Sequence, residues 1–300
     1  QRGFASLFGA FGNPDFDNRD GQMLIGFNTA DDIPTELGVD AYSVTDAVVT
    51  VQYDGQSDFV YDGTVDPVNV YLPEDDPLYQ PDDDAGTPIE LFGAGFRNGF
   101  TAETFEENSP HGDLFGWGVR NAYAMSFDDV GDAIDVSNNV RGFTDPDTDV
   151  GPLDPLVWAV GEADLETGDD VPTNTVFTFE INVEHPDIQQ YFRQAMNEGR
   201  LRLMITSLHE VGVMTGSFPT IFTKENALVD IDAASAATLD LTVEINEDTE
   251  PADINGDGIV NVKDLLLLLG AWGACDECDE DITGDGLVNV NDLLELLGAW

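Results

Sequence analysis

Two short stretches near the C-terminal end carry the side chains best suited to chemistry in this sequence. Residues 253–272 read DINGDGIVNVKDLLLLLGAW and residues 281–300 read DITGDGLVNVNDLLELLGAW, so one pattern recurs after 28 residues with 16 of 20 positions identical. Each copy opens with oxygen-bearing side chains at alternate positions and has a glycine at position 6. Alternating oxygen donors around a sharp turn can surround a hard cation, so we expect one Ca²⁺ ion in each loop.

The expected ligands occupy positions 1, 3, 5, 9 and 12 of a 12-residue loop, with a backbone carbonyl at position 7. In the first loop they are Asp253, Asn255, Asp257, Ile259 through its carbonyl, Asn261 and Asp264. In the second loop they are Asp281, Thr283, Asp285, Leu287 through its carbonyl, Asn289 and Asp292. This is EF-hand loop spacing, and a flexible site of about seven oxygens suits Ca²⁺ better than Mg²⁺. A solvated acidic turn is the alternative interpretation, and the duplication of the full spacing argues against it.

A leucine-rich helix is expected after each loop, and none before it. We expect its leucines to form the core of the unit; they are Leu265, Leu266, Leu268 and Leu269, matched by Leu293, Leu294, Leu296 and Leu297. Tandem loop–helix repeats with Asp at position 12 resemble the type I dockerin modules of cellulosomal proteins, over residues 253–300. The resemblance implies calcium-dependent folding and docking onto a β-sandwich partner, a cohesin. It also implies recognition through loop positions 10 and 11, here Val262, Lys263, Val290 and Asn291, which are not the hydroxyl pair of the best-known clostridial members.

One position breaks the symmetry of the two helices. Leu267 in the first helix corresponds to Glu295 in the second. We interpret Leu267 as part of a partner-facing patch, because a glutamate at the equivalent position suits solvent. A wider core stripe in the first helix is the alternative.

The only two cysteines, Cys275 and Cys278, lie between the repeats. Zinc would need two further soft ligands, and the histidines His111, His185 and His209 are remote in sequence. A redox site would need a thioredoxin-like βαβ setting, which the sequence lacks. A local disulfide in an oxidising, secreted context is the favoured interpretation.

Three further acidic segments are weaker metal candidates. Asp145, Asp147 and Asp149 alternate ahead of Asp154 and predict a possible extra metal site, with an acidic loop as the alternative. In residues 15–20 an arginine stands where a ligand would be needed, and the three adjacent aspartates at 82–84 are not expected to converge.

The first 245 residues have the sequence habit of an antiparallel β-sandwich or jelly roll, with short β-branched runs separated by Gly, Pro, Asp and Asn. The expected strands are 47–53, 68–72, 89–92, 122–127, 156–160, 176–183, 201–208, 220–223 and 238–245. One connector helix is expected from Pro186 to Gly199, with an apolar stripe at Ile188, Tyr191, Phe192 and Met196. We therefore divide the chain into a mainly β domain (1–245), an acidic linker (246–252) and a small helical calcium-binding unit (253–300). The segments DAVVTVQYD (46–54), FPTIFTKEN (218–226) and TLDLTVEI (238–245) resemble secreted jelly-roll domains of the DNRLRE type, related to carbohydrate-binding modules.

Charge excludes several classes of function. The chain has 60 acidic and 10 basic residues, a formal charge of −50, so it lacks the basic patches needed to bind nucleic acid or anionic lipid. No stretch approaches 18 apolar residues, so no membrane span is expected. The first residue is Gln1, which fits a processed mature chain and equally a trimmed one.

We recognise no catalytic motif, and three functions remain open. The favoured one is a secreted, calcium-binding structural protein of bacterial type, outside the cell or at its surface. Its C-terminal unit would dock onto a cohesin-like partner or onto the next copy of the chain to form a polymer. The second is a polysaccharide-binding module, for which Tyr79, Trp117 and Trp158 are candidate aromatic platforms. The third is a polysaccharide-degrading enzyme subunit anchored to a scaffold.

Overall fold

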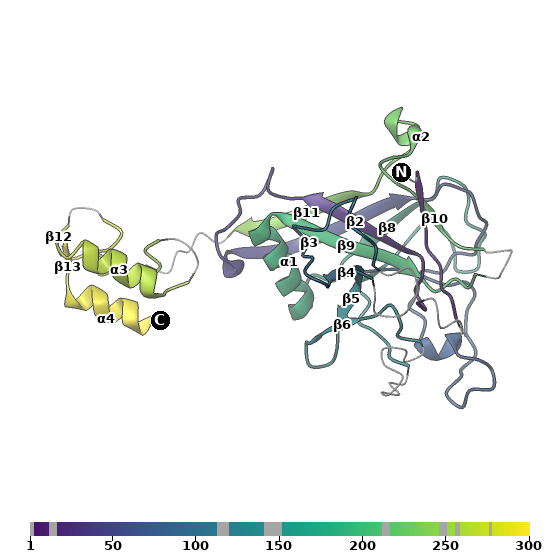
Figure 1. Ribbon diagram of the computed structural model, residues 1–300, viewed down its shortest axis with the longest axis horizontal. Coiled ribbons are helices and arrows are strands. Elements are labelled where there is room, and N and C mark those ends of the chain that lie inside the picture. The colour runs from purple at the N-terminus through teal and green to yellow at the C-terminus, as the bar shows by residue number, and fades with distance from the viewer. Residues whose placement is uncertain are drawn as a thin grey trace.

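The computed structural model describes residues 3–11, 17–112, 120–140, 152–211, 217–245, 251–255, 259–275 and 278–300. Within these residues the protein is mainly β, with 30% of residues in strands and 16% in helices, as expected from the sequence. The strands form several antiparallel sheets, and four α-helices accompany them (Figure 1). The acidic candidates Asp145, Asp147 and Asp149 lie outside the described residues, as does Asp257 of the first loop.

The largest sheet has the order β2–β9–β4–β5–β6, and β7 also pairs with β4. Its strands are β2 (Gln22–Asn28), β4 (Ile89–Phe96), β5 (Ala122–Phe127), β6 (Ala133–Asp135), β7 (Ala159–Val160) and β9 (Arg200–Ser207). All pairings are antiparallel. Seven of the eight residues of β4 are buried, because this central strand is covered on both faces.

A second sheet has the order β11–β3–β8, formed by β3 (Tyr42–Gln52), β8 (Val176–Glu180) and β11 (Thr238–Ile245). Alternate residues of β3 are buried, including Tyr42, Val49 and Val51. The register shifts between Thr242 and Val243 of β11. This bulge keeps the apolar residues of β3 on one face on either side of the irregularity.

Smaller elements complete the main body. Strands β1 (Phe4–Ser6) and β10 (Thr220–Phe222) form a two-stranded pair. Short helical segments are η1 (Val39–Ala41), η2 (Val68–Tyr71) and α2 (Ala227–Asp230). The expectation of a strand at residues 68–72 is therefore wrong. The fixed φ of Pro67 and the Asp154 carboxylate, which accepts from the Val68 N–H at 2.6 Å, favour the 3₁₀ turn η2 instead.

Helix α1 (Pro186–Glu198) connects the two larger sheets and confirms the helix expected from the sequence. It ends at Gly199, which has a positive φ of 74°. The Tyr191 hydroxyl donates to the Arg202 carbonyl of β9 at 2.6 Å, and the Gln189 side-chain amide donates to the Val44 carbonyl of β3 at 2.8 Å. Buried residues of α1 and of both sheets belong to one hydrophobic core.

Residues 251–300 form a small unit at the C-terminal end of the chain (Figure 1). It contains α3 (Val262–Gly270), α4 (Val290–Gly298) and the short pair β12 (Gly273–Ala274) and β13 (Leu287–Val288). Its core is separate from that of the main body and centres on Ala252, Leu268, Val288 and Leu296. Ala252, which we assigned to the linker, is therefore part of this unit.

Candidate metal and docking sites

The aspartate at position 12 is the centre of each C-terminal loop. Asp264 and Asp292 are both fully buried. In the first loop, Oδ1 of Asp264 accepts from the backbone N–H of Asn255 (3.1 Å), and Oδ2 accepts from that of Asn261 (2.8 Å). The second loop repeats these bonds from Thr283 (2.9 Å) and Asn289 (2.7 Å). The repeat in sequence is thus a repeat in hydrogen bonding, and each loop closes onto one carboxylate.

The asparagine at position 9 and the aspartate at position 12 also start the exit helices. Asn261 and Asn289 are the N-cap residues of α3 and α4, and each forms a capping box with the aspartate three residues later. Such a box satisfies helix N–H groups that have no partner within the helix. The Asp at position 12 therefore has a structural reason to be there beside any role as a metal ligand.

In the second loop, oxygen atoms that could bind a metal ion lie close to the side-chain amide of Asn289. The Asp281 carboxylate accepts from the backbone N–H groups of Asp285 (3.1 Å) and Gly286 (2.6 Å), which bends the loop around position 1. Gly286 has a positive φ of 85°, which favours glycine here. The Asn289 amide nitrogen donates to the Leu287 carbonyl at 2.9 Å and lies 3.4 Å from an Asp285 oxygen. Positions 5, 7 and 9 thus converge.

The candidate metal ligands of both loops are carboxylate, amide, hydroxyl and carbonyl oxygens. Such oxygens suit a hard cation such as Ca²⁺. When bound, the ion would neutralise the loop carboxylates and hold the loop closed, through the positions named from the sequence. Among the described residues, compact groups of three carboxylates occur in the main body and not in the second loop. A bound ion would therefore require the Asp281, Asp285 and Asp292 side chains to draw closer together.

Burial pulls the pKa of Asp292 upward, and hydrogen bonds from Thr283 and Asn289 outweigh it and hold that pKa below its usual value. The Asp292 carboxylate is accordingly held in its charged form.

The apolar residues of the C-terminal helices divide differently from the expectation. Leu268 and Leu296 are buried, and Leu265 and Leu293 are half-buried. The other expected core leucines are exposed; they are Leu266, Leu269, Leu294 and Leu297. That part of the prediction is wrong, because two short helices packed only on each other can bury one narrow stripe apiece.

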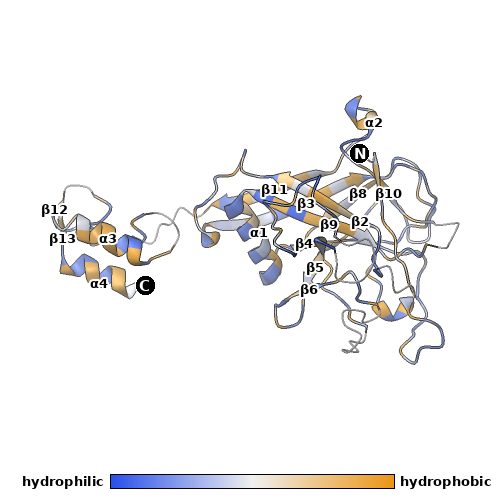
Figure 2. Cartoon of the chain, viewed as in Figure 1, coloured by the Kyte–Doolittle hydropathy of each residue, from blue (hydrophilic) through white to orange (hydrophobic). Residues whose placement is uncertain are grey.

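Exposed apolar side chains concentrate in this unit. Figure 2 colours parts of both α3 and α4 as hydrophobic. Of the 18 exposed large hydrophobic residues among the described part of the chain, 11 lie between residues 259 and 300. Ten of them form five pairs related by the 28-residue repeat, such as Val262 with Val290 and Trp272 with Trp300. The eleventh is Leu267, at 41% exposure. The residues expected to face a partner, Val262, Lys263, Leu267, Val290 and Asn291, are all exposed.

Cys275 and Cys278 form a disulfide between the two repeats, with their Cα atoms 6.0 Å apart. The Cys275 N–H donates to the Gly286 carbonyl of the second loop at 3.1 Å. The three histidines lie in the main body, and His209 is buried against Phe59. The disulfide thus fixes the turn that leads into the second loop.

Acidic clusters that could hold a metal ion also occur in the main body. Asp62, Asp66 and Asp84 each offer a carboxylate oxygen within 4.8 Å of the others, and so do the three aspartates at 82–84. The expectation that residues 82–84 do not converge is wrong, since the chain bends at residues 83–86. Sequence reasoning missed Asp62 and Asp66, which lie four residues apart and outside any alternating acidic run.

The weak candidate at residues 15–20 serves a different purpose. Arg19 forms a buried ion pair with Glu90, and Arg120 forms ion pairs with Asp17 and Asp20. The described acids of this segment are therefore neutralised by arginine. Sequence spacing cannot show this, because the partners lie 71 to 103 residues away.

A cavity of about 230 Å³ opens beside the Arg19–Glu90 pair. It is also lined by Asp66, Tyr71 and Asp154. Burial raises the pKa of Asp66 to about 7, against a lowering contribution from the Tyr71 hydroxyl that donates to it. The cavity thus brings charged and hydroxyl side chains together beside apolar ones such as Val68 and Leu208.

Of the aromatic platforms expected for a polysaccharide, Trp158 is wrong. Trp158 is only 1% exposed and packs on Phe127 and Tyr191 inside the core. Tyr79 is half-buried against a small cluster around Val68, and Trp117 lies outside the described residues. Trp158 cannot stack on a sugar from this position.

Comparison with protein-family models, with curated proteins and with solved structures found no match for this chain. No helix in the described ranges combines the length and apolar character needed to cross a membrane.

Proposed function

We propose that this chain is a non-catalytic, calcium-binding assembly protein whose C-terminal unit docks onto a β-sandwich surface. The observation that carries the proposal is the concentration of exposed leucine, valine and tryptophan side chains on residues 259–300. Large exposed apolar patches on small units mark protein–protein contacts. The pairing of these residues by the repeat gives the unit two similar faces, either of which can meet a partner.

Calcium has a defined part in this proposal. The loops place their oxygen donors directly before α3 and α4, so an ion bound there would fix the helices that carry the apolar residues. The Cys275–Cys278 disulfide is consistent with an oxidising, secreted setting, where Ca²⁺ is abundant. We therefore place the protein outside the cell or at a bacterial cell surface.

The partner we propose has a β-sandwich surface of the cohesin kind, and the main body of another copy is one such surface. We interpret the two larger sheets as the layers of a sandwich, because their buried residues share one core. Docking of one copy's C-terminal unit onto the next copy's body is a heterologous contact. Such a contact generates an open polymer when it does not close into a ring.

The test is light scattering with negative-stain microscopy of the full chain, first in millimolar Ca²⁺ and then in excess EGTA. Polymers that form with calcium and dissolve with chelator support self-docking. The variant Leu267→Glu should weaken them, since it gives the first helix the residue found at position 295. The matched control is Leu228→Glu, an exposed leucine of α2 outside the unit. A chain that binds no Ca²⁺ in its C-terminal loops would overturn the proposal.

A second candidate function is polysaccharide binding or breakdown by the main body, with the C-terminal unit as its anchor. The cavity lined by Arg19, Tyr71 and Asp154 is the observation that favours it. Binding or turnover in a panel of soluble polysaccharides, lost in Asp154→Asn, would support this function over a purely structural one.

A further inference from the structure

Three carboxylates from two loops of the main body meet at one point. Asp62 and Asp66 lie in the loop between the bridge at Val60 and η2, and Asp84 lies in the bend at residues 83–86. Gly86 has a positive φ of 121°, and a Cβ there would lie 2.8 Å from the Cβ of Asp62 and from the Tyr61 carbonyl oxygen. Only glycine lets the segment that carries Asp84 approach Asp62 this closely.

Asp62 has an oxygen that lacks a hydrogen-bond partner in an almost fully buried position. The residue is 2% exposed, and its Oδ2 atom has no hydrogen-bond partner. Its Oδ1 atom accepts from the Thr64 N–H (2.8 Å) and the Thr64 hydroxyl (2.7 Å). Leaving a buried carboxylate oxygen unpaired is costly unless something else binds it.

The surroundings of the cluster have an excess of negative charge. The Thr64 hydroxyl has one proton, yet it lies 2.7 Å from an Asp62 oxygen and 3.1 Å from an Asp84 oxygen, so it can donate to only one of them. Asp82 and Asp83 add two further carboxylates beside Asp84, with oxygens within 4.8 Å of one another. A cation at this point would neutralise the group and occupy the unpaired oxygen.

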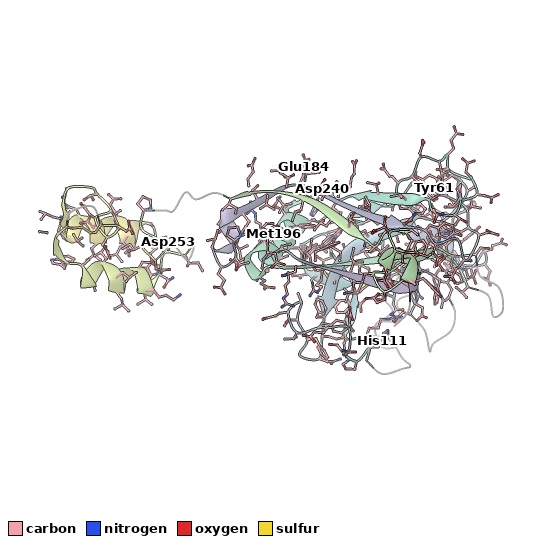
Figure 3. All side chains as sticks on the ribbon, turned by 90° about the horizontal axis from the view of Figure 1, so that it is seen from above. Tyr61, His111, Glu184, Met196, Asp240 and Asp253 are labelled. Carbon is pink, nitrogen blue, oxygen red and sulfur yellow. A yellow bond between two sulfur atoms is a disulfide. The ribbon has the colours of Figure 1, made fainter. Side chains whose placement is uncertain are left out.

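From this geometry we propose that Asp62, Asp66 and Asp84 form a calcium site in the main body. Their oxygens lie within 4.8 Å of one another, a separation that one ion with Ca–O distances of about 2.3–2.6 Å can bridge. Three protein carboxylates on irregular backbone suit Ca²⁺, whereas Mg²⁺ is held by one or two carboxylates and keeps several waters. The site stands apart from the C-terminal loops. Figure 3 shows Tyr61, the neighbour of Asp62, in the main body and Asp253 in the C-terminal unit.

The first test counts calcium ions per full chain by equilibrium dialysis against radioactive Ca²⁺ at millimolar free concentration. Asp84→Asn should bind one ion fewer per chain than the wild type, because it removes a ligand charge from an exposed residue. Asp129→Asn is the matched control, an exposed acid in a turn outside the cluster, and should bind the wild-type number. Equal stoichiometry in Asp84→Asn and the wild type would overturn the site.

A second variant guards against a fold effect. Asp62→Asn removes charge repulsion, so its thermal midpoint in EGTA should equal or exceed that of the wild type, and the rise on adding Ca²⁺ should be smaller. A calcium-induced rise as large as that of the wild type would contradict the proposal. The inference does not depend on the proposed function. Asp281→Asn should remove an ion from the second C-terminal loop only. Asp62→Asn and Asp281→Asn therefore report separately on the site in the main body and on the second C-terminal loop.

Discussion

The buried carboxylate of Asp292 should stabilise the C-terminal unit even without calcium, and one substitution tests this. Asp292→Asn keeps the size of the side chain but replaces one oxygen by an amide group. The two oxygens now accept from Thr283 N–H (2.9 Å), Thr283 hydroxyl (2.9 Å) and Asn289 N–H (2.7 Å). An Asn side chain has one acceptor oxygen and one NH₂ group. Its NH₂ group must therefore face either the Thr283 donors or the Asn289 N–H, which leaves that donor without an acceptor.

The size of the effect follows from these contacts. Leaving a buried N–H unpaired costs about 1–3 kcal/mol, and hydrogen bonds to a charged group exceed neutral ones by roughly 1 kcal/mol. We therefore expect a loss of about 2–4 kcal/mol in EGTA. A unit of this size has a stability of only about 2–7 kcal/mol, so α4 should lose most of its protection.

Hydrogen exchange of peptides from α4, followed by mass spectrometry in EGTA, measures this locally. The expected change is a fall of about 30-fold or more in protection. The control is Asp285→Asn, because residue 285 is exposed and an asparagine oxygen can still accept from the Leu287 N–H. That variant should change protection in EGTA by little. If the two variants behave alike in EGTA, the carboxylate at position 12 has no structural role and the reasoning fails.

Three further predictions concern the cores and the buried charges. Leu296→Ala should destabilise the C-terminal unit by about 2–5 kcal/mol, because Leu296 is buried. Leu294→Ala, at a residue 63% exposed, should change the stability by less than about 0.5 kcal/mol and weaken assembly instead. Chemical unfolding measures the first effect and light scattering the second. Burial lowers the pKa of His209 to about 3 from an ordinary 6.5, so below pH 6.5 the unfolded chain binds a proton that the folded chain does not. Between pH 7 and pH 5, the free energy of unfolding should therefore fall by about 2 kcal/mol more in the wild type than in His209→Gln. Urea unfolding at both pH values measures this, and an equal fall in the two proteins would contradict it. Glu90→Ala should cost about 3–5 kcal/mol, because it leaves the buried Arg19 guanidinium without its carboxylate. A loss below about 2 kcal/mol in urea unfolding would refute this.

Local signals in the sequence were enough for α1, α3, α4 and most strands, whereas the short helix α2 was not predicted. Pro186 at the first helical position, the apolar stripe through Ile188 and Phe192, and Gly199 at the end fix α1 within its own residues. The repeat likewise predicts α3 and α4, since Asn and Asp three residues apart form a capping box without help from distant parts of the chain.

Features that depend on distant partners were not predictable. The segment at 68–72 has a strand-like sequence, but Asp154 caps it as a 3₁₀ turn from 86 residues away. Strand β2 is not predicted from the sequence, because Gly26 and the polar end residues Gln22 and Asn28 interrupt the alternation of apolar and polar side chains. The exposure of Leu266 and Leu294 depends on how many helices the unit has to cover them, which a repeat pattern does not state.

The same distinction applies to the candidate sites. Candidate ligands in the C-terminal loops can be named from the sequence because those of each loop lie within 12 residues of one another. Asp84 lies 22 residues after Asp62, and only the close approach at Gly86 brings the two together. In a chain with 60 acids, sequence alone cannot select the three that meet.

The distribution of charge explains why bound cations, and not salt alone, should matter to this protein. The chain has 10 basic residues for 60 acids, and several arginines already pair with specific carboxylates, as Arg97 does with Asp135. Dispersed surface acids are screened by monovalent salt over a Debye length of about 8 Å at 0.15 M. The oxygens of Asp62, Asp66 and Asp84 lie within 4.8 Å of one another, inside that length, so screening leaves most of their repulsion in place. Raising NaCl should therefore not reproduce the stabilisation by Ca²⁺. Equal stabilisation of the main body by NaCl at matched ionic strength would mean that the cluster binds no specific ion.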